Sequence, residues 1–254
     1  MRGHGKSSFT NDFEIGSLVN DAAEVLKKVV TGSDGIIEVF LIGHSLGAAV
    51  LAALPNVLWN MNNIKFSGLV MVDIIEGNLP LLYLFFIKCI IETAINSLIR
   101  MPSIIKDIPK SFKSLDLAMR WTLSSSHSHH NALAASKRFD DIKTSVESQV
   151  RFNDQTSSYE WITDLSLMEP YWNDWFVGLT RNFLNFPGSR LLILADTDYM
   201  DREMIVAQMQ GKFQLAVVRE SGHAIQEDQP EELAEIVNVM IQKHLKLSQL
   251  LRNK

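Results

Sequence analysis

Glu38-Val39-Phe40-Leu41-Ile42-Gly43-His44-Ser45-Leu46-Gly47 is a short apolar run that ends in the pattern G-x-S-x-G and leads into an alanine-rich segment, residues 48–54. This order predicts a strand, a tight turn and a helix. A serine on such a turn projects its hydroxyl above the end of the strand, so we interpret Ser45 as a nucleophile rather than a structural turn residue. Crowding of the strand and helix backbones predicts that Gly43 and Gly47 must both be small.

Leu46 stands at the start of the predicted helix, directly after Ser45. A backbone N–H at this position can donate a hydrogen bond to an oxyanion, helped by the positive end of the helix dipole. The backbone N–H of Leu46 is therefore our candidate oxyanion donor.

Other apolar runs predict further strands that alternate with helices. Strands are expected at residues 36–42, 66–72, 190–195 and 213–218. Apolar residues at helical spacing predict amphipathic helices at residues 16–30 and 230–245. This alternation is typical of an α/β fold, in which a mostly parallel sheet carries helices on both faces. A chain of 254 residues in this class commonly forms one domain, so we expect a single domain over residues 1–254.

Polar residues follow three of these strands, at the edge where parallel sheets build their sites. Asp73 follows one strand, Asp198 follows the next, and His223 follows the last within Ser-Gly-His. Serine, acid and histidine in this chain order are typical of a nucleophile, an orienting carboxylate and a general base. We predict His223 as the base. Asp73 and Asp198 are both candidates for the acid, and spacing does not choose between them.

Composition excludes several functional classes. The net charge of −5 and a pI near 5.8 argue against a nucleic-acid partner. A single cysteine, Cys89, excludes an intramolecular disulfide and fits a reducing compartment. The first residues lack the apolar core of a signal peptide, and the very apolar run at residues 79–91 is shorter than the roughly 20 residues that cross a bilayer. We expect a soluble intracellular protein without a membrane partner.

The remaining histidines and aromatic residues are predicted to be structural. His127, His129 and His130 lie in a serine-rich stretch without further ligands nearby, so we expect a loop and no metal. His44, at the x position of the motif, is expected to point away from the site, and no partner is predicted for His4 or His244. The aromatic residues at 159–184 are predicted to form the core of a lid.

Five segments of the chain resemble the protein phosphatase methylesterases, a family with the α/β-hydrolase fold. They are residues 42–47, 71–77, 109–115, 171–179 and 208–214, and the last two are distinctive of that family. The likeness runs in order from residue 2 to about residue 244. In that family the acid of the catalytic triad follows the strand after the nucleophile, which falls on Asp73 here. The resemblance therefore implies a triad of Ser45, Asp73 and His223.

The resemblance also implies an activity. The family contains serine carboxylesterases that remove the methyl ester from the C-terminal leucine of the protein phosphatase 2A catalytic subunit, so that subunit and its methylated tail are the expected partner. It implies no metal or organic cofactor, and a cytoplasmic or nuclear location. It further implies a helical lid inserted at about residues 78–185.

Two departures from the family pattern bear on this expectation. The family carries further strands, and a His-Gly-Gly loop with a second oxyanion donor, ahead of the segment that matches residues 2–5. We therefore expect N-terminal strands to be missing, which would leave strand 36–42 as an exposed sheet edge. Residues 78–92 have no counterpart in the family. Two alternatives follow: a catalytically impaired phosphatase-binding protein, and a small-molecule carboxylesterase or lipase.

Overall fold

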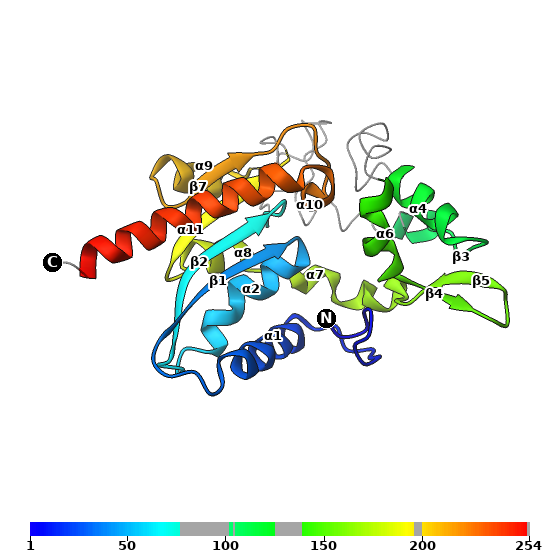
Figure 1. The fold of residues 1–254 in the computed structure, drawn as a ribbon, viewed down its shortest axis with the longest axis horizontal. Coiled ribbons are helices and arrows are strands. Elements are labelled where there is room, and N and C mark those ends of the chain that lie inside the picture. The colour runs from blue at the N-terminus through cyan, green and yellow to red at the C-terminus, as the bar shows by residue number, and fades with distance from the viewer. Residues whose placement is uncertain (77–101, 104, 125–138, 196–199, 253–254) are drawn as a thin grey trace.

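The computed structural model describes residues 1–76, 102–103, 105–124, 139–195 and 200–252, and its main feature is a four-stranded sheet (Figure 1). The strands β1 (Ile37–His44), β2 (Ile64–Val72), β6 (Ser189–Leu194) and β7 (Gln214–Val217) lie in the order β1-β2-β6-β7. Each neighbouring pair is parallel. All four strands therefore end at the same edge of the sheet, and the predicted parallel sheet is confirmed.

Helices cover both faces of the sheet, which confirms the predicted layers. One face packs against α1 (Ile15–Val30), α2 (Leu46–Val57), α8 (Leu179–Leu184) and α9 (Arg202–Met209), and the other against α10 (Ile225–Asp228) and α11 (Pro230–Arg252). Successive residues of β2 point to opposite faces: Leu69 and Met71 join the first core, and Val70 and Val72 the second. Residues 69–72 of β2 are buried on both faces of the sheet, and this part of the strand is continuously apolar.

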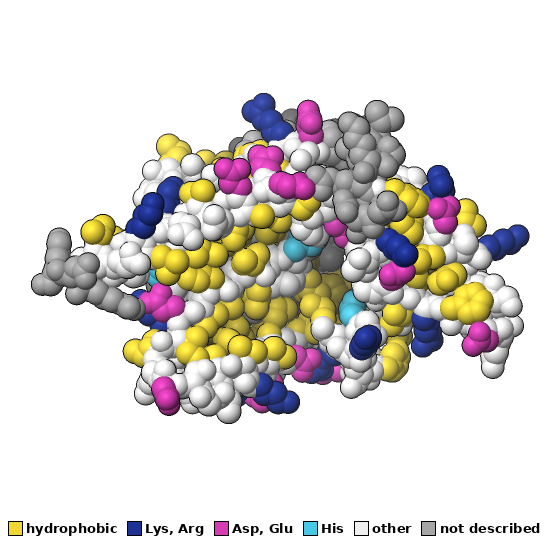
Figure 2. Space-filling model, in the orientation of Figure 1, with side chains coloured by type: hydrophobic (Ala, Val, Ile, Leu, Met, Phe, Trp, Pro, Cys, Tyr) yellow, Lys and Arg dark blue, Asp and Glu magenta, His cyan; other side chains and the backbone are white. Residues whose placement is uncertain are grey.

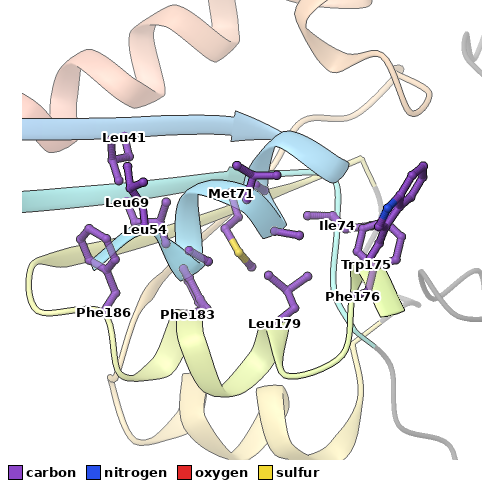
Figure 3. Close-up of a cluster of buried hydrophobic side chains, with 14 of the residues drawn as sticks. Leu41, Leu54, Leu69, Met71, Ile74, Trp175, Phe176, Leu179, Phe183 and Phe186 are labelled. Atoms are coloured by element: carbon purple, nitrogen blue, oxygen red, sulfur yellow. The ribbon is translucent and has the colours of Figure 1, made fainter. Parts of the chain in front are cut away.

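Aromatic residues of the segment after β5 (Ser158–Trp161) belong to the first of these cores. Figure 3 shows Leu179 and Phe183 of α8 facing Met71 and its neighbours, with Trp175 and Phe176 alongside Ile74. The helical turns η1 (Leu165–Tyr171) and α7 (Trp172–Trp175) carry this segment to α8. The prediction that these aromatic residues form the lid core is therefore wrong for Trp172, Trp175 and Phe176, which pack in the core beside the sheet.

A second, smaller group of elements has a core of its own. The antiparallel strands β3 (Ser111–Phe112), β5 and β4 (Val150–Asn153) lie in the order β3-β5-β4, and α4 (Leu115–Ser124) and α6 (Phe139–Glu147) pack on them. Trp161 belongs to this group, where its indole N–H donates to the Pro109 carbonyl at 2.8 Å. The group lies within the predicted lid range of about 78–185; those limits, and the single domain, stay predictions.

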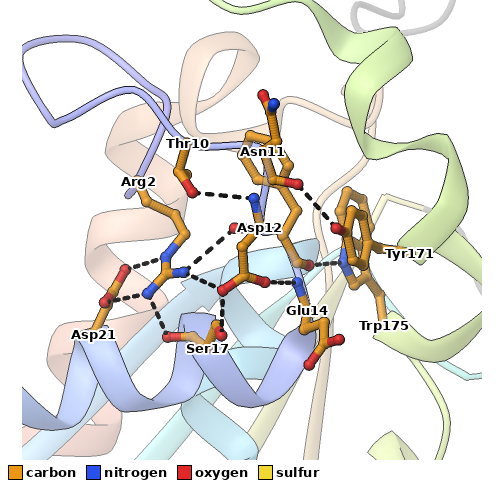
Figure 4. A network of polar contacts seen from close by, with 10 residues as sticks. Arg2, Thr10, Asn11, Asp12, Glu14, Ser17, Asp21, Tyr171 and Trp175 are labelled. Atoms are coloured by element: carbon orange, nitrogen blue, oxygen red, sulfur yellow. Dashed lines mark hydrogen bonds and ion pairs between the residues drawn. The ribbon is translucent and has the colours of Figure 1, made fainter.

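Arg2 anchors the first residues of the chain to α1 (Figure 4). Its guanidinium donates to Asp21 from Nε at 2.6 Å and from Nη2 at 2.7 Å, and to Asp12 from Nη1 at 2.7 Å. Nearby, the indole N–H of Trp175 donates to the Phe13 carbonyl at 2.8 Å. These bonds fix the segment before α1 against α7.

Strand β1 is the edge strand of the described sheet, as expected, and its surroundings are apolar. Ile36 and Ile42 are 69% and 50% exposed, and Val25 and Val29 on α1 are exposed as well. Figure 2 shows hydrophobic side chains gathered over this face, between α1 and α11. An apolar composition like that of β1 is typical of a strand buried on both faces. The edge of β1 that is unpaired in the described sheet can bind a further strand.

Helix α11 continues beyond the predicted end at residue 245, to Arg252. Its apolar face packs on the sheet through Ile236, Val237 and Met240. Beyond residue 245 the side chains of Leu247, Leu250 and Leu251 are exposed, so packing does not hold this end. Residues 246–252 are mostly good helix formers, which accounts for the extension.

The turn between β1 and α2 places different demands on its two glycines. A Cβ on Gly43 would lie 2.6 Å from the Cα of Ala48 and 2.7 Å from the carbonyl carbon of Gly47. A Cβ on Gly47 would meet nothing within 4 Å. The prediction that both must be small is therefore right for Gly43 and wrong for Gly47 among the described residues.

Alanine substitutions test this difference. Gly43→Ala is expected to lower the free energy of unfolding by about 1–3 kcal/mol or more, because the added methyl group strikes backbone atoms that cannot rotate away. Gly47→Ala, the matched control, is expected to raise it by up to about 1 kcal/mol, since alanine is the better helix former. Urea denaturation of both variants measures the two changes. Equal losses of stability would contradict the assigned contacts.

Candidate active site

Ser45 occupies the turn between β1 and α2, in a conformation rare for a residue with a side chain. Its φ is 50° and its ψ −123°, a strained combination of the kind found at functional sites. Its N–H donates to the Val72 carbonyl at 3.0 Å, and its carbonyl accepts from the N–H groups of Ala48 at 2.9 Å and Ala49 at 3.4 Å. Leu46 follows as the first residue of α2, so its N–H is one of the donors that a helix leaves without an intrahelical acceptor.

Asp73 and His223 lie 150 positions apart in the sequence and are joined by a hydrogen bond. Nδ1 of His223 lies 2.9 Å from Oδ2 of Asp73; the carboxylate is 13% exposed and the imidazole 40%. Because a carboxylate accepts, Nδ1 carries the proton, and Nε2 of the neutral ring is an acceptor. The imidazole thus has the tautomer and orientation that a general base requires.

The neighbouring strand β6 fixes Asp73 firmly. The Asp73 N–H donates to the Ile193 carbonyl at 2.7 Å, and its Oδ1 accepts from the Ala195 N–H at 2.9 Å. Its φ of 50° turns the chain sharply at the end of β2. Since Val72, just before it, accepts the bond from Ser45, the serine and the aspartate lie next to each other along the sheet edge.

The structure thus joins Asp73 and His223 by a hydrogen bond and places Ser45 beside them. Within the described part of the chain, no hydrogen bond joins the Ser45 hydroxyl to His223. Bonds of this kind are often long without substrate and tighten in the complex. The rival acid Asp198 lies outside the described residues, as do residues 79–91 and the histidines at 127–130.

His44 lies against His223, so the prediction that it points away from the site is wrong. Its Nε2 is 2.7 Å from the His223 carbonyl oxygen, and the two ring centroids are 4.5 Å apart. The loop that carries His223 returns over the end of β1 and contacts the His44 side chain there. The sequence around residue 44 does not indicate this contact.

His44 also differs from an ordinary histidine in the pKa of its imidazole. Burial lowers the pKa of the His44 imidazole to about 4, and the nearby His223 acts in the same direction. Because a carbonyl only accepts, Nε2 of His44 carries the proton. Nδ1, the remaining acceptor, lies 3.4 Å from the side-chain nitrogen of Gln226.

Two buried carboxylates that the sequence did not single out hold the loops of the site. Glu76 accepts from the N–H groups of Gly178 at 2.9 Å and Thr180 at 3.0 Å, which ties the chain after Asp73 to the start of α8. Asp228 accepts from the Gly222 N–H at 2.7 Å and so holds the loop that carries His223. The only signal in the sequence was an acid a few residues after Asp73 and after His223, which is too common to interpret.

His244, for which we predicted no partner, contacts a carboxylate at the opposite end of β1. Its Nε2 lies 3.0 Å from Oε2 of Glu38, and Nζ of Lys65 lies 2.9 Å from Oε1. The bonds from Lys65 and then His244 lower the pKa of the Glu38 carboxyl to about 2. This cluster joins α11 to the edge strand. His4, also left without a partner, contacts the Arg2 carbonyl through Nδ1 at 2.9 Å.

The described ranges lack two other kinds of site. They contain no group of three or more histidine, cysteine or acidic side chains arranged to hold a metal ion. No helix within these ranges has both the length and the apolar character needed to cross a membrane.

The fold and this site define an α/β hydrolase. A profile of the Alpha/beta hydrolase family matches residues 1–236, and the chain belongs to that family. Among solved structures, an E-2-(acetamidomethylene)succinate hydrolase superposes with a TM-score of 0.66 at 16% identity, covering 95% of this chain and 79% of its own. A peroxisomal alpha-beta-hydrolase of Saccharomyces cerevisiae gives 0.62 at 15% identity, covering 95% and 64%. Both show the shared fold.

More specific similarity is to proteins named protein phosphatase methylesterase 1. The Candida albicans protein is 37% identical over 236 residues, covering 92% of this chain and 56% of its own length. The Schizosaccharomyces pombe protein is 32% identical over 245 residues, covering 93% of this chain and 62% of its own. Across four such relatives, the chain spans 50% to 62% of their length.

The depressed pKa of His44 predicts a pH dependence of stability. In the unfolded chain this imidazole takes up a proton near its ordinary value of 6.5, but in the fold only near 4. The unfolded state therefore binds more protons between these values, and the free energy of unfolding contributed by His44 falls as the pH falls from 6.5 toward 4.

Urea denaturation of the wild type and of His44→Gln across this range isolates the effect, because groups that do not contact His44 titrate alike in both. The wild type is expected to lose stability relative to the variant on acidification, with no change in the difference above about pH 7. A difference that stays constant from pH 7 to pH 4 would show that His44 titrates normally in the fold.

Proposed function

We propose that this protein is a serine carboxylesterase that removes the methyl ester from the C-terminal leucine of the protein phosphatase 2A catalytic subunit. The observation that carries the proposal is the bond from Nδ1 of His223 to Asp73, at the sheet edge beside Ser45. The names of the relatives support the substrate. The partner is accordingly the methylated tail of that subunit.

In the first half-reaction, the Ser45 hydroxyl attacks the ester carbonyl while Nε2 of His223 takes its proton. Asp73 stabilises the imidazolium through the bond to Nδ1. The N–H of Leu46 donates to the oxyanion of the tetrahedral intermediate, favoured by its place at the start of α2. Collapse of the intermediate returns the proton to the methoxy oxygen, and methanol leaves.

In the second half-reaction, water attacks the acyl group on Ser45. His223 takes a proton from the water and returns it to the serine oxygen, which frees the leucine carboxylate. Every step uses proton transfer and electrostatic stabilisation by side chains and the backbone. The proposal therefore requires no metal or organic cofactor.

A fluorophosphonate probe and methylated phosphatase test the nucleophile and the substrate together. The wild type is expected to be labelled at Ser45 and to release methanol from the phosphatase. Ser45→Ala is expected to abolish labelling and to lower turnover by on the order of 10⁶-fold. Labelling without demethylation, combined with hydrolysis of a small ester, would favour a small-molecule esterase. Phosphatase binding without any labelling would favour a binding protein.

The acid is tested by a matched pair of substitutions. Asp73→Asn is expected to reduce turnover by on the order of 10⁴-fold, since an amide facing Nδ1 favours the wrong imidazole tautomer. Asp198→Asn is expected to leave turnover close to that of the wild type. Steady-state rates on methylated phosphatase decide between them, and the opposite pattern would reassign the acid to Asp198.

A further inference from the structure

His44 lies in the active site, and the proposed reaction gives it no role. The residue precedes Ser45 directly, so its backbone is part of the turn that positions the nucleophile. Its side chain reaches the carbonyl of His223, 179 positions later in the sequence, at 2.7 Å. One residue thus links the backbone of the nucleophile to the backbone of the base.

The contact from His44 falls on the segment that carries His223. Residues 218–224, between β7 and α10, form no helix or strand. Asp73 binds the imidazole through one ring nitrogen, and Asp228 holds the backbone on one side of it through Gly222. The contact from His44 is to the backbone carbonyl of His223 itself, and the two rings lie 4.5 Å apart at 48°.

The hydrogen bonds around His44 suit a fixed donor rather than a proton carrier. Nε2–H donates to a carbonyl, and the Gln226 amide faces Nδ1. Both ring nitrogens are thus engaged, which favours one tautomer. A neutral ring in a fixed tautomer can hold the His223 backbone without placing a positive charge beside the base.

We propose that His44 is a positioning residue, which sets the distance between Ser45 and the imidazole of His223 by donating a hydrogen bond to the His223 carbonyl. The inference rests on the proposed esterase function for its kinetic consequence, and on the structure alone for the bond. An apolar ring at position 44 would preserve the packing and remove the donor. A glutamine would preserve a donor near the position of Nε2.

His44→Phe and His44→Gln therefore separate the hydrogen bond from the packing, with His4→Phe as a control for replacing a histidine outside the site. His44→Phe is expected to lower the rate of Ser45 labelling and the kcat on methylated phosphatase by about 10- to 100-fold, with little change in KM. His44→Gln is expected to stay within about 3-fold of the wild type, since it restores the donor. Thermal unfolding of each variant monitors the fold.

Nuclear magnetic resonance of protein carrying isotope-labelled histidine gives a readout that needs no turnover. In the wild type, His44 is expected to be neutral at pH 7 with its proton on Nε2. The downfield Nδ1 proton of His223, bonded to Asp73, is expected in the wild type and in His44→Gln. In His44→Phe we expect this resonance to be broadened by exchange.

The two proposals fail in different ways. If the wild type is not labelled at Ser45, the esterase function fails, while the resonances still test the bond. If the wild type is labelled but His44→Phe keeps the same labelling rate and the same His223 resonance, the positioning role is wrong. The role is also overturned if His44 in the wild type carries its proton on Nδ1 and none on Nε2 at pH 7, a result that does not depend on any variant folding.

Discussion

The parallel arrangement of four strands is the constraint on which the rest of this structure depends. Because β1, β2, β6 and β7 run in one direction, their carboxyl ends meet at one edge, and residues far apart in the sequence follow those ends. The backbone bond from Ser45 to Val72 and the side-chain bond from His223 to Asp73 both form there. The chemistry of the site is thus a consequence of the order in which strands pair.

Much of this arrangement could be predicted from the sequence. Apolar runs such as the one in β2 indicated strands buried on both faces, and the pattern around Ser45 indicated the tight turn that the structure forms. Local rules sufficed because each strand, turn and flanking helix is specified within a few residues. Choosing Asp73 over Asp198 needed the resemblance to a family, since both follow a strand and only pairing in space distinguishes them.

Contacts between distant segments could not be predicted in this way. The place of His44 depends on a loop that returns over β1 from 179 positions away, and Trp175 packs beside the sheet because η1 and α7 carry it back there. Glu76 became informative only when its partners, the N–H groups at 178 and 180, were seen. The spacing of hydrophobic and charged residues in the sequence indicates that they have partners, but it does not identify those partners.

The central claim is that Ser45, His223 and Asp73 act together at this edge of the sheet, with Leu46 as oxyanion donor. A crystal structure of the phosphonate adduct at Ser45 tests it most directly, because the adduct resembles the tetrahedral intermediate. The account predicts Nε2 of His223 within hydrogen-bonding distance of the Ser45 oxygen, Nδ1 still on Asp73, and the phosphonyl oxygen on the Leu46 N–H. An adduct in which the imidazole remains beyond reach of the serine oxygen would contradict it.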